Sequence, residues 1–311
     1  MTAPKLSVVT PSFNQGSFLE RTIRSVLDQG YPNLEYVIVD GGSSDGSAEI
    51  IRRYEDRLSW WVSEPDEGQA AAINRGIEGT SGEIVAYINS DDYYLPGAFE
   101  TAIAALERGG APWLAGAVVD IAEGSPPEEV GVWQPEPPSA CEGPLPGRHW
   151  WLLAPWHVPQ PSSFWRRDLF ERYGLFRAEM HYAFDAEFMV RLAMAGEMPQ
   201  LLRDDVLAAR AEHPQQKSRH LRNWQPEVKR FAEIFDPQLT SRERRHLAML
   251  RGPVGASRAV RGTLLSPVLR FGGLILGRLP ERIRPPIRHR DRKPALAEFS
   301  SRNRRREPHR G

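Results

Sequence analysis

Cysteine is almost absent from the sequence, since Cys141 is the only one among 311 residues. A single cysteine excludes a disulfide within the chain and a multi-cysteine zinc site, and it is typical of a reducing compartment. The sequence also lacks an apolar run of about 18 residues or more, the length that a transmembrane helix needs. These absences predict a cytoplasmic protein.

The formal net charge of zero conceals two parts of opposite sign. Residues 217–311 carry 24 Lys and Arg against 8 Asp and Glu, a net charge of +16, which leaves −16 for residues 1–216. Such a basic segment favours an anionic surface as its partner. Three interpretations stay open: peripheral docking at the inner face of the cytoplasmic membrane, a solvated tail, and non-specific contact with nucleic acid. A broken apolar stretch over 264–279 favours the membrane, and no specific nucleic-acid site is expected.

The N-terminal part alternates short apolar runs with amphipathic segments. We expect helices over 17–29, from residue 47 to about 54, and over 68–77, and strands over 6–10, 34–39, 58–62 and 84–88. Strands that alternate with helices indicate βαβ units, so the expected fold class is α/β, with a Rossmann-like, mostly parallel sheet flanked by helices.

The C-terminal part divides by composition. Further helices are expected over 168–173 and 185–195, and the Pro-, Gly- and Trp-rich stretch 120–161 is predicted to be a long insertion over the site. The predicted organisation is a catalytic domain over 1–215, a helical extension over 216–280 that contacts the membrane in one interpretation, and a basic disordered tail over 281–311.

Polar clusters follow three of the expected strands: residues 11–14, 40–44 and 89–92. Ligands of open α/β sheets bind beyond the carboxyl ends of the strands, so the shared placement predicts one binding site. In the third cluster, Asp91 and Asp92 offer the oxygen ligands that Mg²⁺ and Mn²⁺ take. An N-cap for the next helix is the alternative for these aspartates.

Four other residues are candidates for chemistry. Asp40 ends a strand, where a carboxylate can bind a ribose or a base, and Asp66 precedes a helix. Asp185 opens a helix and could act as the base that takes a proton from a hydroxyl. His213 could contact a metal or a diphosphate. The alternatives are a turn residue for Asp40, helix N-termini for Asp66 and Asp185, and a loop histidine for His213.

The ordered set of motifs resembles the inverting family 2 glycosyltransferases of GT-A fold, over roughly residues 5–215. The segments that carry the resemblance are 9–14 (VTPSFN), 25–33 (SVLDQGYPN), 37–46 (VIVDGGSSDG), 63–69 (SEPDEGQ), 89–97 (NSDDYYLPG), 160–167 (QPSSFWRR) and 185–192 (DAEFMVRL). Two positions depart from the family pattern: Asn89 replaces the first Asp of the DxD motif, and Phe184 stands where a Glu often precedes the base.

The resemblance implies roles for the candidates. The nucleotide-sugar site would be formed by Thr10, Pro11, Asn14, Asp40, Gly42, Ser43, Asp66, Asn89, Ser90 and Asp91. It makes Asp91 the best ligand for Mg²⁺ or Mn²⁺, with Asp92 as an assisting ligand, and it makes Asp185 the catalytic base. His213 stays a weaker metal candidate on its own residue type.

The function implied is transfer of a hexose from a UDP-, GDP- or dTDP-sugar to a hydroxyl of a glycan or lipid-linked glycan. The reaction would invert the anomeric carbon, and many bacterial members of the family act in cell-envelope polysaccharide biosynthesis. Two alternatives are weighed against it. A non-catalytic nucleotide-sugar-binding module rests on the departures at Asn89 and Phe184. A nucleotidyltransferase is disfavoured because the segment after the first strand lacks a Gly-rich basic loop.

Overall fold

A computed structural model describes residues 3–122, 131–135 and 158–214, with separate positions between 216 and 244. The chain divides into two compact units, Met1–Ala248 and Met249–Gly311, and all described residues belong to the first. The apolar stretch 264–279, the tail 281–311 and most of the expected extension 216–280 therefore lie outside the described residues. Within the described part, no helix has the length and apolar character to span a bilayer.

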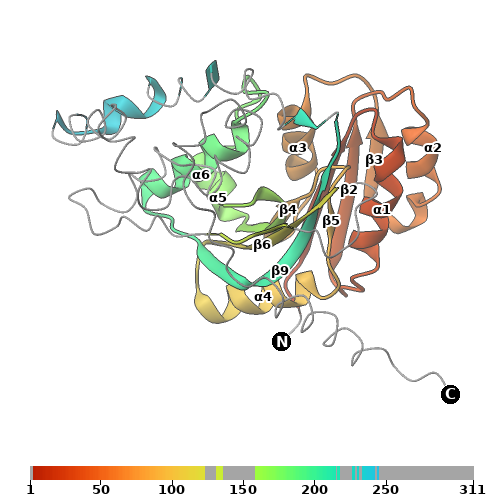
Figure 1. Cartoon of the computed structure of the whole chain (residues 1–311), viewed down its shortest axis with the longest axis horizontal. Helices are drawn as coiled ribbons and strands as arrows, with labels where there is room; N and C mark the ends of the chain where they lie inside the picture. The colour runs from red at the N-terminus through yellow and green to blue at the C-terminus, as the bar shows by residue number, and fades with distance from the viewer. Residues whose placement is uncertain are drawn as a thin grey trace, which may run out of the picture. The chain divides into compact units, whose positions relative to one another are not determined.

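The N-terminal half of the first unit is a parallel βαβ array (Figure 1). Its strands are β1 (Leu6–Ser12), β2 (Leu34–Asp40), β3 (Trp60–Ser63) and β4 (Ile84–Tyr87). Its helices are α1 (Gly16–Leu27), α2 (Ser47–Arg52), η1 (Glu55–Arg57) and α3 (Gln69–Glu78). The expected strands and helices agree with these elements to within a few residues, except that the second helix ends earlier, at Arg52.

The C-terminal half adds antiparallel pairs. Its strands are β5 (Tyr93–Tyr94), β6 (Trp113–Ala122), β7 (Gly131–Trp133), β8 (Ser163–Arg166) and β9 (Gln200–Glu212). Its helices are α4 (Ala98–Gly109), η5 (Gln160–Ser162), α5 (Asp168–Tyr173), α6 (Phe184–Ala195) and η7 (Asp236–Gln238). The sheet order is β3-β2-β1-β4-β8-β6-β9-β5, with β7 on β6. The α/β fold class is confirmed, and the complete sheet is mixed: β8 is antiparallel to β4 and β6, and β9 is parallel to β6.

Alternation along each strand builds a core on both faces of the sheet. Side chains such as Leu6, Val8 and Ile38 belong to the apolar core formed with α1, α2 and α4. The following residue on the other face, Val9, packs so tightly on α3 that a Cβ at Gly76 would collide with it. Because successive side chains of a strand point to opposite faces, a strand covered on both sides needs a nearly continuous apolar run. β4 (IVAY) and residues 36–39 of β2 have this property, whereas β1 also buries Ser7, Thr10 and Ser12.

Of the expected insertion over 120–161, only parts are described. Residues 120–122 complete β6, residues 131–133 form β7, which pairs antiparallel with β6, and η5 begins at Gln160. Residues 123–130 and 136–157 lie outside the described residues. The prediction that this segment covers the site falls mainly on them and stays a prediction.

Candidate active site

The carboxyl ends of β1 and β2 form a clamp around the turn after β2. Asp40 is fully buried and accepts hydrogen bonds from the Ser43 amide (2.9 Å), the Ser43 hydroxyl (2.6 Å) and the Ser63 hydroxyl (2.7 Å). Asn14 adopts the left-handed conformation that Asn tolerates (φ 52°). Its backbone amide donates to Ser43 Oγ, and its side-chain Oδ1 accepts the backbone amide of Ser44. The predicted residues Asn14, Asp40 and Ser43 thus lie together.

Two other predicted residues of this region lie inside β1. Thr10 and Pro11 are both buried, and the Thr10 hydroxyl bonds to Tyr36 Oη in the core (3.0 Å). Beside them, Ser12 Oγ and Gln15 Oε1 are buried atoms without a hydrogen-bond partner among the described residues. Because buried polar atoms are seldom left unpaired, these two atoms are suited to receive polar groups of a ligand at the strand ends.

Gly41 and Gly42 allow Asp66 and its loop to approach the same turn. A Cβ at Gly41 would lie 3.0 Å from Asp66 Oδ2, and Gly42 has φ +79°, where a side chain is strained. Asp66 also accepts the Gly68 amide (2.7 Å), which is the capping role that its alternative interpretation gave. The candidates Gly42 and Asp66 therefore border the clamp of Asn14, Asp40 and Ser43.

Hydrogen bonds from side chains of α1 hold the loop 89–92, which follows β4. Thr22 Oγ1 bonds to the carbonyl oxygens of Ser90 (2.8 Å) and Asp92 (2.6 Å), and the Arg21 guanidinium reaches the Asp91 carbonyl (3.5 Å). Ser90 is itself buried. This loop therefore has little freedom, so the side chains of Asn89 and Asp91 project from a rigid support.

Asp91 and His213 form a close pair. Asp91 Oδ2 lies 2.9 Å from His213 Nε2, and the His213 ring stacks on Phe18 with centroids 4.6 Å apart. Both residues lie just outside the antiparallel pair of β5 and β9, in which Tyr93 lies opposite Ala209. Asp91 precedes β5 and His213 follows β9, so the two side chains approach each other beyond the end of that pair.

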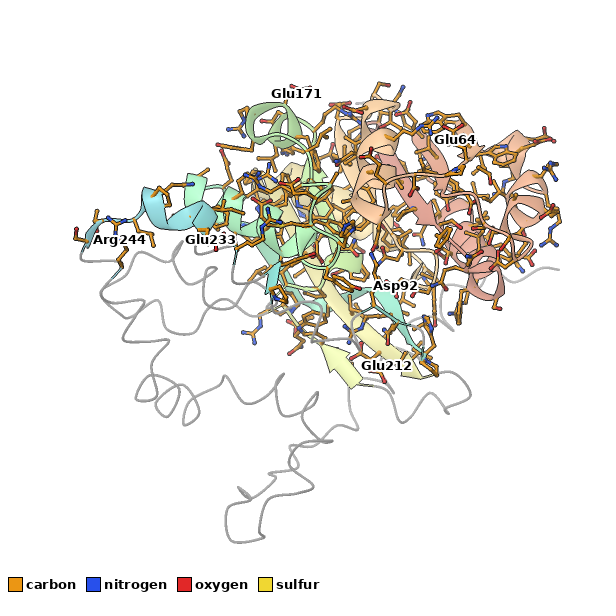
Figure 2. All side chains as sticks on the ribbon, turned by 90° about the horizontal axis from the view of Figure 1, so that it is seen from above. Glu64, Asp92, Glu171, Glu212, Glu233 and Arg244 are labelled. Carbon is orange, nitrogen blue, oxygen red and sulfur yellow. The ribbon has the colours of Figure 1, made fainter. Side chains whose placement is uncertain are left out.

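Asp92 points inward rather than toward the pair. It is 3% exposed, accepts the Ala211 amide (3.2 Å) and lies 3.3 Å from Asn89 Nδ2. Burial, and then the neighbouring Asp91 charge, raise the pKa of Asp92 well above its usual value. Figure 2 labels Asp92 among the side chains of the described part. These contacts give Asp92 a structural position behind Asn89.

Asp91 Oδ2 and His213 Nε2 are hydrogen-bonded to each other at 2.9 Å. The same separation is compatible with two neighbouring ligands of one octahedral cation, which lie about 3 Å apart for bonds of about 2.1 Å. No group of three His, Cys, Asp or Glu that could hold a metal occurs in the described ranges. Two protein ligands are sufficient where substrate phosphates and water complete the coordination.

Asp185 lies in the first turn of α6, where its Oδ1 accepts the Ala186 amide (2.7 Å). Burial raises the pKa of Asp185 to about 6, against the opposing effects of that hydrogen bond and of the Lys217 charge. The same carboxylate, after burial itself, contributes to the raised pKa of Tyr87. A carboxylate with a pKa near 6 is a stronger base than an exposed one and is still ionised at neutral pH.

Gln69 and Lys217 connect the two halves of the site. Gln69 Nε2 donates to Asn89 Oδ1 (2.6 Å), and Gln69 Oε1 accepts from Lys217 Nζ (2.9 Å). Lys217 Nζ also donates to the His181 carbonyl (2.9 Å), in the loop just before α6. Burial lowers the pKa of Lys217, and the charges of Glu227, Asp185 and Asp66 oppose that shift. The ammonium thus lies among the acidic groups of both halves.

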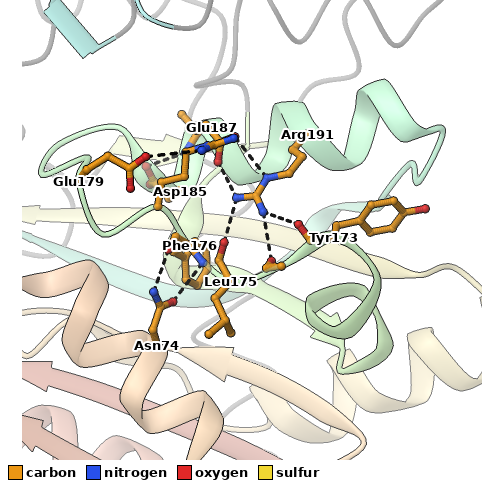
Figure 3. Close-up of polar contacts among 11 residues, drawn as sticks. Asn74, Tyr173, Leu175, Phe176, Glu179, Asp185, Glu187 and Arg191 are labelled. Carbon is orange, nitrogen blue, oxygen red and sulfur yellow. Dashed lines mark hydrogen bonds and ion pairs between the residues drawn. The ribbon is translucent and has the colours of Figure 1, made fainter. Parts of the chain in front are cut away.

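The loop before α6 is anchored by ion pairs and amide contacts (Figure 3). Arg191 binds Glu187, which is fully buried, at 2.6 Å and donates to the Leu175 carbonyl at 3.0 Å. Asn74 of α3 bonds to Phe176 in both directions, through its amide nitrogen (2.8 Å) and its oxygen (3.1 Å). Figure 3 shows Asp185 beside this network, at the start of the helix that carries Glu187 and Arg191.

Sequence reasoning missed Gln69, Lys217, Glu227, Phe18 and Gln160. Gln69 and Gln160 belong to motifs that the sequence already displayed, and Gln160 Oε1 lies 3.4 Å from Asn89 Nδ2. Phe18 falls within the expected helix 17–29, and no sequence signal marks it as a contact of His213. No periodicity marks Lys217 or Glu227, because their contacts depend on how the chain returns after β9.

Comparison with known proteins identifies the class. An uncharacterized glycosyltransferase of Mycobacterium tuberculosis, Rv1514c, is 32% identical over 200 residues, which are 63% of this chain and 71% of that one. The Campylobacter jejuni GalNAc(5)-diNAcBac-PP-undecaprenol beta-1,3-glucosyltransferase is 33% identical over 102 residues, which are 32% of this chain and 33% of the relative.

Solved structures agree with the fold. S. aureus TarS 1-349 in complex with UDP-GlcNAc superimposes with a TM-score of 0.54 and 20% identity, over 68% of this chain and 60% of that chain. The mannosyltransferase PcManGT of Pyrobaculum calidifontis, solved with GDP-Man and Mn²⁺, gives a TM-score of 0.54 and 22% identity, over 90% and 82%. The fold and the relatives define a glycosyltransferase. The glycosyl transferase family 2 profile matches residues 7–150, and the chain belongs to this family.

Proposed function

We propose that the protein transfers a hexose from a nucleotide-diphosphate-sugar to a hydroxyl group, with inversion at the anomeric carbon and with a divalent cation as cofactor. The observation that carries this proposal is the chain of hydrogen bonds from Asn89 through Gln69 and Lys217 to the His181 carbonyl, just before α6. Asn89 shares its loop with Asp91, which pairs with His213, and Asp185 lies in the first turn of α6, so the candidate cation ligands and the candidate base belong to the two segments that this chain joins.

In the proposed step, Asp185 takes the proton of the acceptor hydroxyl while the acceptor oxygen forms its bond to the anomeric carbon. The bond from that carbon to the diphosphate oxygen breaks, and the nucleoside diphosphate leaves with the electron pair. Asp91 and His213 would hold the cation, which offsets the charge on the leaving diphosphate. Lys217, which donates to Gln69 Oε1 and to the His181 carbonyl, supplies a positive charge between Asn89 and the start of α6.

The mixed ligand pair favours Mn²⁺ over Mg²⁺. Mg²⁺ is bound through oxygen ligands, whereas Mn²⁺ belongs, as its weakest-binding member, to the first-row series of ions that bind sites with nitrogen as well as oxygen donors. The solved PcManGT complex contains Mn²⁺ and GDP-Man, and a TarS complex contains UDP-GlcNAc. UDP-, GDP- and dTDP-sugars therefore all belong in the test.

The test is a thermal-shift panel of UDP-GlcNAc, UDP-glucose, GDP-mannose and dTDP-glucose, with and without Mn²⁺. A donor that binds only the native state raises the melting temperature by mass action. We expect one donor to give the largest shift and to need Mn²⁺ for it. If Mn²⁺ changes no shift, the cation role of Asp91 and His213 is wrong. NMR of the transferred product then decides the stereochemistry, and retention would refute the displacement step.

We propose a glycan or lipid-linked glycan as the acceptor, used at the inner face of the cytoplasmic membrane. The C. jejuni relative carries a PP-undecaprenol acceptor in its name, and residues 217–311 of this chain have a net charge of +16. Anionic lipid attracts Lys and Arg near its surface with about 1 kcal/mol each. We expect the full chain to float with vesicles that contain phosphatidylglycerol and not with neutral ones. Equal recovery with both would remove the membrane from the proposal.

A further inference from the structure

The Glu227 carboxylate binds backbone amides just before α6, although Glu227 belongs to a distant part of the sequence. Its Oε1 accepts the amide of His181, and its Oε2 accepts the amides of Tyr182 and Ala183, all at 2.8 Å. Glu227 is itself buried, with 9% of its surface exposed. Three successive amides that converge on one carboxylate form an anion-binding nest, and bonds of this length to a charged acceptor are strong.

These three amides belong to the residues that place the helix. The Ala183 carbonyl accepts the first helical bond of α6, from the Glu187 amide at 2.8 Å. Asp185 lies two residues after Ala183, so the direction of its side chain is set by the backbone that Glu227 holds. Lys217 binds the same loop at the His181 carbonyl. Residues 181–183 are therefore fixed from two points beyond β9.

We propose that Glu227 is a positioning residue for Asp185, and that this part of the chain, beyond the segment matched by the family profile, completes the catalytic site. The proposal rests on the proposed role of Asp185 as the base. Phe184, directly before Asp185, has no carboxylate, and the carboxylate that binds the backbone at this helix start comes from Glu227.

A second effect of Glu227 is electrostatic. The charged groups that act on the pKa of Asp185 are Lys217 and Glu227. The negative charge of Glu227 adds to burial in raising the pKa of Asp185, and the positive charge of Lys217 opposes it. Removing the Glu227 charge therefore shifts the titration of Asp185 toward lower pH. A residue that only stabilised the fold would leave that titration unchanged.

The test uses the full chain with Glu227→Gln and Glu227→Ala, and Glu233→Ala as the matched control. Glu233 is an exposed glutamate a short way further along the chain (Figure 2). Gln has nearly the same size as Glu, but its side chain has only one acceptor oxygen. Its NH₂ group therefore faces either the backbone amide of His181 or the backbone amides of Tyr182 and Ala183. Hydrogen–deuterium exchange then reports on residues 181–183, and ¹³C-carboxyl NMR reports the titration of Asp185, assigned with Asp185→Asn.

For both Glu227 variants we expect faster exchange at residues 181–183, by about tenfold or more, and a lower Asp185 titration midpoint. Glu233→Ala should match the wild type in both. Hydrolysis of UDP-GlcNAc or GDP-mannose with Mn²⁺ should lose about 10- to 100-fold in kcat with little change in KM, since misplacing a catalytic group has costs of this size. In an Asp185→Asn background, Glu227→Gln should cost no further kcat, because both act through one group.

Unchanged exchange at residues 181–183 would overturn the proposal. Faster exchange with an unmoved Asp185 titration would also overturn it, because Glu227 would then be a structural residue only. The exchange and NMR measurements do not depend on catalysis. If Glu227 moves both of them while neither sugar nucleotide is turned over, the positioning stands and the proposed donors are wrong.

Discussion

Replacing Asp185 with Asn should stabilise the protein while it removes activity. The Asp185 carboxylate is held where burial raises its pKa to about 6, so its ionised form is unfavourable in the folded state. Asn has the same shape and stays neutral, and its oxygen can still accept the Ala186 amide, as Asp185 does now. The substitution therefore removes the free-energy cost of burying an ionised carboxylate, and it also removes the catalytic base.

The size of the effect follows from the difference between the folded pKa of about 6 and the ordinary value of 3.8. Each pKa unit corresponds to about 1.4 kcal/mol, so the ionised carboxylate costs about 3 kcal/mol of folding free energy at pH 8. A protein becomes less stable as pH rises when folding raises the pKa of one of its carboxyl groups. This loss of stability begins near the pKa of the group in the unfolded state and is complete above its pKa in the folded state. At pH 4 the cost is below about 1 kcal/mol.

Urea unfolding at a series of pH values from 4 to 8 measures this difference. We expect Asp185→Asn to exceed the wild type by about 3 kcal/mol at pH 8, or roughly 6–12 °C in Tm, and by much less at pH 4. Asp168→Asn is the matched control, since Asp168 also lies in the first turn of a helix but has 54% of its side chain exposed. The control should stay within about 0.5 kcal/mol of the wild type throughout.

Sugar transfer supplies the second half of this prediction. In the wild type, the rate should rise with pH through about 6 as Asp185 ionises. In Asp185→Asn it should fall by about 10²–10⁴-fold, the usual contribution of a general base. If the stability difference between Asp185→Asn and the wild type is no larger at pH 8 than at pH 4, the burial argument is refuted. A variant that keeps its rate would refute the base.

Three further predictions concern other residues. Asp91→Asn should abolish the Mn²⁺-dependent thermal shift and leave the far-UV spectrum native; a retained shift would exclude Asp91 as a ligand. Phe18→Leu removes the ring that stacks on His213 at 4.6 Å, and because such pairs contribute about 0.5–1.5 kcal/mol, Mn²⁺ titration by calorimetry should show affinity about 2- to 12-fold weaker. Gly76→Ala should lower the free energy of unfolding by about 1–3 kcal/mol through collision with Val9, and a more stable variant in urea would show that α3 can move away from β1.

The N-terminal half could be predicted from sequence because its signals are local. Each strand from β1 to β4 is a short apolar run, and Pro, Gly or Asp residues follow closely. Since parallel strands end at one edge, the closeness of Asn14 to Asp40 followed from the topology alone. What the sequence could not reveal is that the Thr10 hydroxyl points into the core toward Tyr36.

The C-terminal half was harder for physical reasons. β6 is a run of ten residues that is apolar except for Asp120, and periodicity alone does not distinguish such a run from a buried helix. β9 contains the exposed residues Arg203, Asp204 and Asp205, which interrupt its alternation. Without these strands, nothing in the sequence placed His213 at Asp91, and its role as a ligand was a weak candidate.

β9 explains why the site depends on both halves of the chain. It runs parallel to β6 and antiparallel to β5, and it ends at Glu212, directly before His213. His213 then meets Asp91 on the cation side, while Lys217, four residues later, meets Gln69 and the His181 carbonyl on the base side. One short segment thus contacts both centres. We expect Mn²⁺ to strengthen donor binding, and linkage then requires the donor to strengthen Mn²⁺ binding by the same factor, which calorimetric titration in both orders measures.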